Sequence, residues 1–293
     1  MAAGILLWLA FAVKPDVGLS AQLDQIAKTV HGRVGVSALA IETGQSASVR
    51  GGDRFPMESV CKLPIAMAIL NDIDRGDLML LEKLRVLPAD MVPPDFHSPL
   101  RDQNPHGTEL SVRELLQFTI QQSDGTASDV LLRLAGGPRR VTSYTRRIVG
   151  SGIAIEETEN AIARSDKAGY RNWATPEVSV ALLQSLQEGR ALSADSRELL
   201  LNLLATSSTS THRIQGLLPS GTIVAHKTGT SGTYHGITRG TNDIGLVTLP
   251  NGRHLAIAVF VADSSADEMA REGVIAKIAK AVWDHWSSAN RAD

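Results

Sequence analysis

Two residues near the start of a helical segment have the chemistry of a nucleophile and its base. Ser59 and Lys62 lie three positions apart in the tetrapeptide SVCK. Positions i and i+3 share one helix face, so the two side chains are neighbours. A serine hydroxyl is a weak nucleophile until a base takes its proton, and a lysine with a lowered pKa can be that base. The spacing therefore favours a serine nucleophile, although a helix N-cap beside a snorkelling lysine is the structural alternative.

A second serine, Ser123, occurs in Ser123-Asp124-Gly125 between two helical segments. In a site of this kind it can relay a proton to a leaving nitrogen atom. The structural alternative is a helix cap, because Ser, Asp and Gly are common turn residues.

The segment from Lys227 to Gly232, KTGTSG, follows the apolar run TIVAH. Small residues on a sheet edge leave room for the backbone of a ligand. Lys227 adds a cation for a carboxylate, Thr228 and Ser231 add hydroxyl donors, and the Thr230 N–H is placed to stabilise an oxyanion. For the tripeptide Lys227-Thr228-Gly229 alone, a flexible strand end is the structural alternative.

The stretch 153–175 holds three glutamates, Glu156, Glu157 and Glu159. It has no clear hydrophobic period, and a loop of this length inside a domain is usually functional. A carboxylate near the nucleophile can activate a water molecule for hydrolysis. We expect this role for one glutamate and a solvated position for the other two.

The composition excludes several classes of protein. The 293 residues include 29 basic and 31 acidic side chains, for a net charge of −2, and 43% are hydrophobic. This is ordinary globular composition and offers no footprint for nucleic acid. One cysteine, Cys61, allows neither an intramolecular disulfide nor a cysteine zinc site. The eight histidines lack ligand spacing, and no P-loop or G-x-G-x-x-G motif is present, so we expect neither metal nor cofactor.

The N-terminal residues 5–13 form the apolar run ILLWLAFAV. It is too short to span a bilayer but suits the core of a signal peptide, with Leu19-Ser20-Ala21 as a cleavage site. No Lys or Arg precedes the run, and a buried N-terminal helix is the alternative. We therefore expect residues 1–21 to be a signal peptide, a periplasmic or secreted protein, and no stable membrane association.

Hydrophobic periodicity predicts strands at both ends of the chain and helices between them. Strands are expected at 34–42, 46–50, 222–226, 243–249 and 254–262, and a final helix at 265–287. Helical spacing covers 60–74, 111–121, 126–135, 139–149, 176–188 and 195–205, whereas 88–110 and 153–175 read as loops. We expect an α/β layered fold: an antiparallel sheet flanked by terminal helices (22–55 and 206–293) with an inserted all-helical subdomain (56–205).

The three motifs S-x-x-K, S-D-G and K-T-G follow one another at separations of 64 and 104 residues. Together they resemble the active-site serine penicillin-recognising enzymes, and among these the class A β-lactamases. The segments FPMESVCKL, QQSDGTASDVLLRLAGGP, GYRNWATP, GLLPSGTIVAHKTGTSG and TNDIGLVTLPNGR look like the PER-type and VEB-type extended-spectrum branch. The resemblance covers roughly residues 22–287.

The resemblance implies a role for each motif residue. Ser59 is the acylated nucleophile, Lys62 takes part in its activation, and Ser123 passes a proton to the β-lactam nitrogen. The N–H groups of Ser59 and Thr230 form the oxyanion hole. The substrate carboxylate is held by the K-T-G segment, with Arg213 supporting its pocket; the residues are Lys227, Thr228, Gly229, Thr230 and Ser231.

The glutamate that deacylates the enzyme in this resemblance must be chosen by counting. The family loop reads E-x-x-L-N, and Glu156 is followed by an asparagine at the right distance, but this puts Glu159 at the apolar position. In the family, the deacylating glutamate follows the proline that corresponds to Pro138 by 21 residues. This count selects Glu159 instead and puts Ile162 at the apolar position. Ala163 then stands where most class A enzymes have the asparagine that helps hold the deacylating water. PER-type enzymes also lack that asparagine.

Two further departures concern the substrate. Gly125 replaces the asparagine of S-D-N, which contacts the substrate side-chain amide. The resemblance therefore places Gly125 among the substrate-binding residues, and the replacement bears on substrate preference. Glu58 and Ser231 occupy the positions that a disulfide bridges in class A carbapenemases, and that bond is impossible here.

We expect a monomeric serine β-lactamase that hydrolyses penicillins and cephalosporins without a cofactor. A D-alanyl-D-alanine peptidase or a penicillin-binding sensor, which acylates but deacylates slowly, is the alternative.

Overall fold

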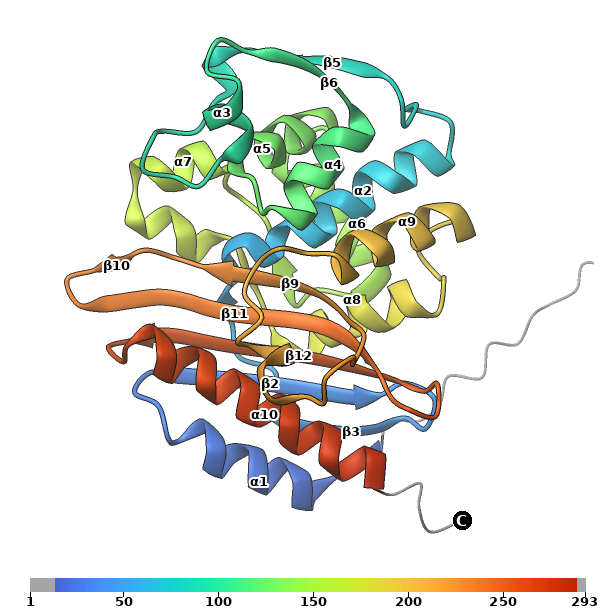
Figure 1. Cartoon of the computed structure of the whole chain (residues 1–293), viewed down its shortest axis with the longest axis vertical. Coiled ribbons are helices and arrows are strands. Elements are labelled where there is room, and N and C mark those ends of the chain that lie inside the picture. Colours follow the sequence, from blue (N-terminus) through green and yellow to red (C-terminus); the bar gives the residue numbers. More distant parts are fainter. Residues whose placement is uncertain (1–13, 289–293) are drawn as a thin grey trace, which may run out of the picture.

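The computed structural model describes residues 14–288, in which helices and a twisted sheet form separate layers (Figure 1). The main sheet has seven strands: β1 (Lys14–Pro15), β2 (Arg33–Ala40), β3 (Gln45–Val49), β9 (Val224–Thr230), β10 (Thr233–Tyr234), β11 (Ile237–Thr248) and β12 (His254–Ser264). The helices are α1 (Val17–Ala27), α2 (Lys62–Asp74), α3 (Pro99–Gln103), α4 (Val112–Gln121), α5 (Gly125–Leu134), α6 (Pro138–Val149), α7 (Glu159–Arg164), α8 (Pro176–Gln187), α9 (Ala194–Ala205) and α10 (Glu268–Ser288).

Strands from the two ends of the chain pair in the centre of this sheet. The strand order is β1-β3-β2-β12-β11-β10, with β9 also paired to β11. β12 lies antiparallel to β2 on one side and to β11 on the other. The α/β layered fold with strands from both termini is therefore confirmed.

The residues of β12 alternate between two hydrophobic cores, as the period of a strand requires. Leu255, Ile257, Val259 and Val261 pack with α1 and α10 on one face. Ala256, Ala258, Phe260 and Ala262 pack against the helices of the middle of the chain on the other face. A strand buried on both faces has to be apolar along its length, which explains the unbroken run LAIAVFVA.

Helix α2 forms the centre of the helical layer. Ten of its residues are buried, and it packs against α4, α5, α6 and α9. A helix that is hydrophobic all round is a core helix, so α2 is held on every side. This fixes the side chains at its first turn, where Lys62 lies.

Several short elements were not predicted because they are too short to show a period. The expected loop 88–110 contains α3 and the strand β6 (Thr108–Ser111), which pairs with β5 (Lys83–Val86). The expected loop 153–175 contains α7 and the strands β7 (Ile153–Ala154) and β8 (Trp173–Ala174), which join β4 (Phe55–Pro56) in a second sheet. β9 and β11 also include residues beyond the expected strands, 227–230 and 237–242, most of which are small or polar.

The first described elements begin before the expected start at residue 22. β1 pairs with β3, and Asp16 caps α1 by accepting the Leu19 N–H at 2.8 Å. Leu19 and Leu23 are buried in the core beneath α10. Residues 17–21 thus belong to α1, while the apolar run 5–13 lies outside the described residues. Within residues 14–288, no helix is both long and apolar enough to cross a membrane.

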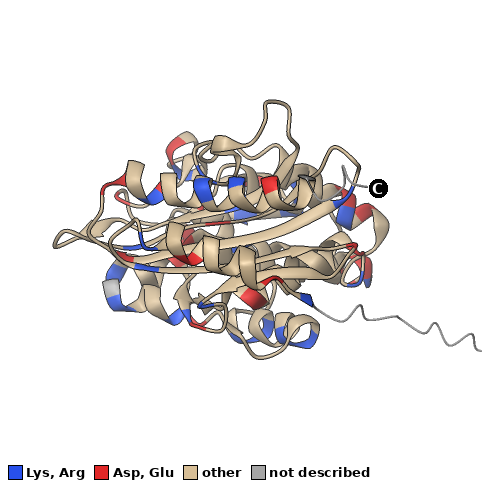
Figure 2. Cartoon of the chain, turned by 90° about the horizontal axis from the view of Figure 1, so that it is seen from below, with Lys and Arg blue, Asp and Glu red and all other residues tan. Residues whose placement is uncertain are grey.

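Acidic and basic residues are mixed on the face seen from below, including the exposed side of α10 (Figure 2). This agrees with the small net charge of the chain. The chemistry of the protein therefore has to be sought in a local site rather than in an overall field.

Candidate active site

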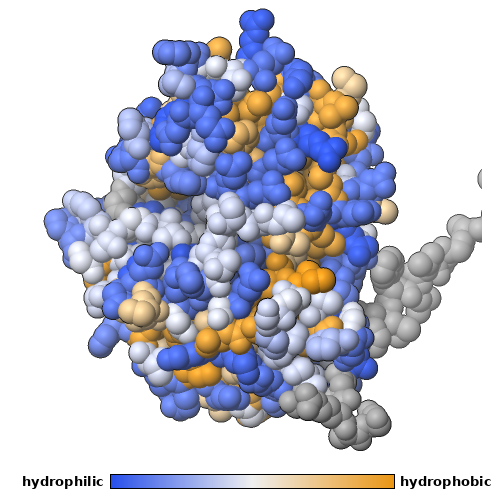
Figure 3. All heavy atoms as spheres, in the orientation of Figure 1, coloured by the Kyte–Doolittle hydropathy of each residue, from blue (hydrophilic) through white to orange (hydrophobic). Residues whose placement is uncertain are grey.

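A cleft of about 400 Å³ lies where the helical layer meets β9. Figure 3 shows pale, weakly polar residues across the middle of this face, between the helical half above and the sheet below. The cleft brings together residues from distant parts of the chain, which are Ser59, Lys62, Ser123, Glu159, Thr228, Thr230 and Ser231. All three sequence motifs and one of the three candidate glutamates meet here.

Ser59 lies in a short 3-10 helix, η1 (Glu58–Cys61), that leads directly into α2. The Lys62 ammonium donates to Ser59 Oγ at 2.8 Å and to the Ser123 carbonyl at 2.7 Å, and it forms an ion pair with Glu159 Oε1 at 2.9 Å. Lys62 is only 2% exposed. An ammonium with three acceptors is not a base, but loss of one proton to Glu159 makes Lys62 the base for Ser59.

A second buried lysine reaches the same serine pair from the sheet. The Lys227 ammonium donates to Ser123 Oγ at 3.0 Å and to the Thr228 carbonyl at 3.1 Å. Ser123 has a left-handed backbone, with φ at 57°, which is uncommon for a residue other than glycine. Complete burial and the charge of Lys62 lower the pKa of Lys227 to about 7. Ser123 therefore stands between two cationic side chains.

Of the three glutamates in the loop, only Glu159 lines the cleft. It is the first residue of α7, which Thr158 caps. Glu156 is exposed and pairs with Arg171 at 3.2 Å, and Glu157 pairs with the same arginine at 2.6 Å. This arrangement favours the choice of Glu159 over Glu156.

Asp129 on α5 holds the start of α7, and sequence reasoning missed it. Its carboxylate accepts the Glu159 N–H at 2.7 Å and the Asn160 N–H at 2.9 Å. Burial is the main cause that raises the pKa of Asp129 to about 6, and the nearby Glu159 charge adds to it. Nothing in the segment GTASDVLL distinguishes this aspartate from an ordinary helix residue. Only the folded chain shows that it fixes the backbone of Glu159.

Gly229 allows β9 to approach the backbone of the nucleophile. A Cβ atom there would lie 2.6 Å from the Met57 carbonyl oxygen and 3.1 Å from the Ser59 nitrogen. Any side chain at this position would push the strand away from Ser59. The glycine of K-T-G therefore sets the spacing between the Ser59 backbone and Thr230, the two expected oxyanion donors.

Arg213 lies behind β9 rather than in the cleft, and it is 3% exposed. Its guanidinium donates to the Gly229 carbonyl at 3.1 Å and to Thr230 Oγ1 at 2.7 Å, and it pairs with Glu272 at 2.9 Å. It therefore orients β9 and adds positive charge beneath it, as a supporting residue of the expected carboxylate pocket.

Thr209 is a cleft residue that no sequence motif indicated. It accepts a hydrogen bond from Thr228 Oγ1 at 2.8 Å, and Ser210 beside it also lines the cleft.

Ser231 lies just beyond the end of β9. Its hydroxyl accepts the Gly240 N–H at 3.1 Å.

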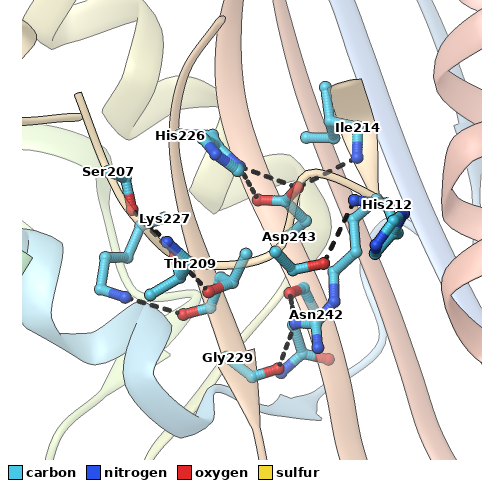
Figure 4. Close-up of polar contacts among 12 residues, drawn as sticks. Ser207, Thr209, His212, Ile214, His226, Lys227, Gly229, Asn242 and Asp243 are labelled. Atoms are coloured by element: carbon cyan, nitrogen blue, oxygen red, sulfur yellow. Dashed lines mark hydrogen bonds and ion pairs between the residues drawn. The ribbon is translucent and has the colours of Figure 1, made fainter. Parts of the chain in front are cut away.

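His226 is buried and has a structural role. Its Nδ1 atom lies 3.0 Å from both carboxylate oxygens of Asp243, which also accepts the Ile214 N–H at 3.1 Å (Figure 4). This buried group ties the segment that carries Arg213 to β9 and β11.

Gly125 does not line the cleft, although we expected it to bind the substrate. It begins α5, and its N–H donates to the His97 carbonyl at 3.1 Å. A Cβ atom at Gly125 would lie 3.2 Å from that carbonyl oxygen. Asp95, Phe96 and His97 line the cleft instead. The glycine thus lets the segment 95–97 close over α5 and form this wall.

Within the described residues, no group of three or more His, Cys, Asp or Glu side chains is arranged to hold a metal ion. Cys61 is buried under the nucleophile, and its burial raises the pKa of the thiol well above its usual range.

The cleft holds the reactive groups of an active-site serine acyl-transfer enzyme. One serine hydroxyl is bonded to a buried lysine, which also pairs with a glutamate, and a second serine is bonded to a second lysine. The chain belongs to the β-lactamase enzyme family, whose model matches residues 18–286, and to its class A branch.

Known relatives agree with this assignment. The chain is 35% identical to β-lactamase VEB-1 and 32% identical to the extended-spectrum β-lactamase PER-1, both from Pseudomonas aeruginosa. These matches cover 92% and 90% of this chain, and 90% and 86% of the relatives. Among solved structures, a β-lactamase from Chitinophaga pinensis superposes with a TM-score of 0.89 at 40% identity. The TLA-3 extended-spectrum β-lactamase superposes with the same score at 39% identity. They cover 92% of this chain and 99% and 98% of the structures.

Proposed function

We propose that this protein hydrolyses the β-lactam ring of penicillins and cephalosporins through an acyl-enzyme on Ser59, which Glu159 then deacylates. The observation that carries the proposal is the Lys62 ammonium, which bridges Ser59 Oγ at 2.8 Å and Glu159 Oε1 at 2.9 Å. One proton path thereby connects the nucleophile with the carboxylate that later activates water.

Acylation begins when Ser59 Oγ attacks the carbonyl carbon of the β-lactam. Its proton passes to Lys62, which has first given a proton to Glu159. Negative charge develops on the carbonyl oxygen, and the N–H groups of Ser59 and Thr230 receive it. The C–N bond then breaks, the nitrogen takes a proton from Ser123, and Lys62 replaces the proton on Ser123. Glu159 returns its proton to Lys62 and is again a carboxylate.

Deacylation uses a water molecule between Glu159 and the ester. The Glu159 carboxylate takes a proton from the water, and the resulting hydroxide attacks the ester carbon. Ser59 leaves with a proton and the opened acid is released. The position of Glu159 depends on the N–H bonds that Glu159 and Asn160 donate to Asp129 at the start of α7.

The pKa of Lys227 predicts how activity depends on pH. Because this pKa is near 7 in the free protein, the ammonium is charged below that pH and neutral above it. A substrate carboxylate favours the charged form, so binding at higher pH requires uptake of a proton. We expect kcat/KM for a carboxylate-bearing substrate to fall above about pH 7, by up to about tenfold per pH unit.

The control for this pH dependence is Lys227→Arg, because a guanidinium keeps its charge throughout this range. Profiles of kcat/KM from initial rates are compared between the two proteins. A wild-type profile that stays flat between about pH 7 and about pH 9 contradicts the assignment of the decline to Lys227.

The function itself is tested by counting rings opened per enzyme molecule. The purified protein is mixed with excess benzylpenicillin or a chromogenic cephalosporin, and separately with a D-alanyl-D-alanine peptide. We expect many turnovers of the β-lactams and none of the peptide. One ring opened per enzyme molecule, with peptide cleavage, would favour the peptidase instead.

We also propose a periplasmic or secreted location and a monomeric state. The apolar run 5–13 supports export. Leu19-Ser20-Ala21 lies within α1, with Leu19 in the core, so the structure does not favour cleavage there. Processing is tested by N-terminal sequencing of the protein recovered from cells.

A further inference from the structure

A buried ion pair lies directly beneath the nucleophile. Arg239 on β11 donates through Nε to Glu58 Oε1 at 2.7 Å and through Nη2 to Oε2 at 3.0 Å. The two side chains are 9% and 7% exposed, and both line the cleft. Such a two-point contact between guanidinium and carboxylate is the strongest geometry for this pair. Glu58 is the residue immediately before Ser59.

Glu58 has an uncommon backbone conformation, with φ at 49°. Residues other than glycine rarely adopt this left-handed region, so the surrounding structure has to hold it. Asn242 on β11 donates its side-chain amide to the carbonyls of Pro56 and Met57 at 2.8 and 3.1 Å. Gly240 leaves room for the Glu58 side chain, since a Cβ there would lie 2.8 Å from Glu58 Cγ. β11 thus fixes the turn that presents the Ser59 N–H.

Arg239 also contacts the loop that carries Glu159. A Cβ atom on Gly169 would lie 2.2 Å from the guanidinium carbon, so the guanidinium packs directly against this glycine. The guanidinium carbon lies 5.8 Å from the centre of the Tyr170 ring. One side chain therefore touches both the turn before the nucleophile and the deacylation loop.

The charge of Glu58 has a consequence for the reaction. Acylation creates negative charge on an oxygen that the Ser59 N–H receives, one residue from the Glu58 carboxylate. An uncompensated carboxylate so close opposes that charge in a site from which water is partly excluded. The Arg239 guanidinium places a positive charge directly on that carboxylate. Other charged groups near this region include Lys62, Lys227, Glu159 and Asp95.

We propose that Arg239 is a positioning residue for acylation, which holds the Glu58 turn and neutralises Glu58 so that the oxyanion hole at Ser59 can stabilise negative charge. The inference rests on the proposed function, because it concerns the acylation step of that reaction. The Arg239–Glu58 pair thereby affects the rate of acylation as well as the packing around it.

The test measures acylation by stopped flow with a chromogenic cephalosporin, in wild type, Arg239→Gln, Glu58→Gln and the double variant. We expect Arg239→Gln to slow acylation by about tenfold or more, because the Glu58 carboxylate beside the oxyanion hole loses the positive charge of Arg239. Removing that carboxylate as well, in the double variant, restores most of the rate. Glu58→Gln alone has the smaller effect. Arg239→Lys keeps the cation and stays within about threefold of wild type.

The double variant separates this role from a purely structural one. Loss of packing alone would leave the double variant at least as slow as Arg239→Gln, whereas removal of the opposing Glu58 charge restores its rate of acylation. Thermal unfolding shows which variants are folded at the temperature of the assay.

Arg75→Gln serves as a matched control, because Arg75 forms an exposed ion pair with Asp77 at 3.0 Å outside the cleft. It should leave acylation unchanged. The inference is overturned if folded Arg239→Gln acylates at the wild-type rate, or if the folded double variant is as slow as Arg239→Gln. A wild-type protein that does not acylate at all refutes the proposed function instead.

Discussion

Glu159→Gln should convert the enzyme into a protein that acylates and then stops. The amide cannot take a proton from water, so deacylation should slow by about 10²–10⁴-fold, the usual range for the loss of a general base. Acylation should also slow, because Lys62 loses the carboxylate that takes its proton, but it should still outpace deacylation, since Ser59, Ser123 and the oxyanion donors remain. Intact-protein mass spectrometry after mixing with a cephalosporin should show a stable adduct on nearly every molecule.

Glu156→Gln is the matched control for this variant. Glu156 lies three residues away in the same loop, but it is exposed and pairs with Arg171 at 3.2 Å. It should turn over like the wild type and show no accumulated adduct. If Glu156→Gln accumulates the adduct while Glu159→Gln turns over normally, the assignment of the deacylating glutamate is wrong.

Ser59→Ala should abolish both acylation and turnover. Removing the nucleophile leaves no atom that can form the ester, so kcat/KM should fall by about 10⁴-fold or more. Stability should change little, because the hydroxyl accepts one bond from Lys62 and has no large buried volume. Rates of hydrolysis and mass spectra of the mixed protein measure the two losses separately.

A folded Ser59→Ala protein that still gains the mass of the opened β-lactam would contradict the assignment of the nucleophile. Thermal unfolding supplies the control, since a fold close to wild type shows that the loss is chemical. Ser231→Ala offers a comparison at a second cleft hydroxyl, which contacts the Gly240 N–H. It should weaken substrate binding far more than it slows the chemical step.

The long elements could be predicted from periodicity, because each buries one face or both. The runs at 34–42 and 254–262 became β2 and β12, and the helical spacing at 60–74 became α2. The elements that were missed are short, such as α7, which begins at Glu159 and has six residues. Its position depends on Asp129 and the cap Thr158 rather than on a hydrophobic face. Local pattern carries no information about such distant hydrogen bonds.

The reactive groups could be predicted because their types and spacing are unusual in combination. The residues that support them could not, and Asp129, Thr209 and Arg239 are the main examples. Each acts by contacting a segment 19 to 181 residues away in the chain. An arginine in a strand or an aspartate in a helix has no distinguishing neighbours in the sequence. Their roles follow only from the pairing of β11 with β9 and the packing of α5 against α7.

Gly125 illustrates a prediction made from resemblance that the folded chain modifies. The resemblance placed this residue in contact with the substrate, whereas in the structure its backbone holds His97. Phe96 and His97 provide the cleft wall in that region. Substrate preference should therefore depend on the segment 95–97 more than on the first residue of α5.

The most direct test of the central claim, hydrolysis through an ester on Ser59, is a rapid-quench measurement on the wild-type protein. The protein is mixed with a cephalosporin, quenched at successive times, digested and analysed by mass spectrometry. We predict that an adduct forms on the peptide containing Ser59 and decays at a rate sufficient to account for kcat. Many turnovers with no adduct on that peptide at any time, in wild type and in Glu159→Gln alike, would contradict the claim.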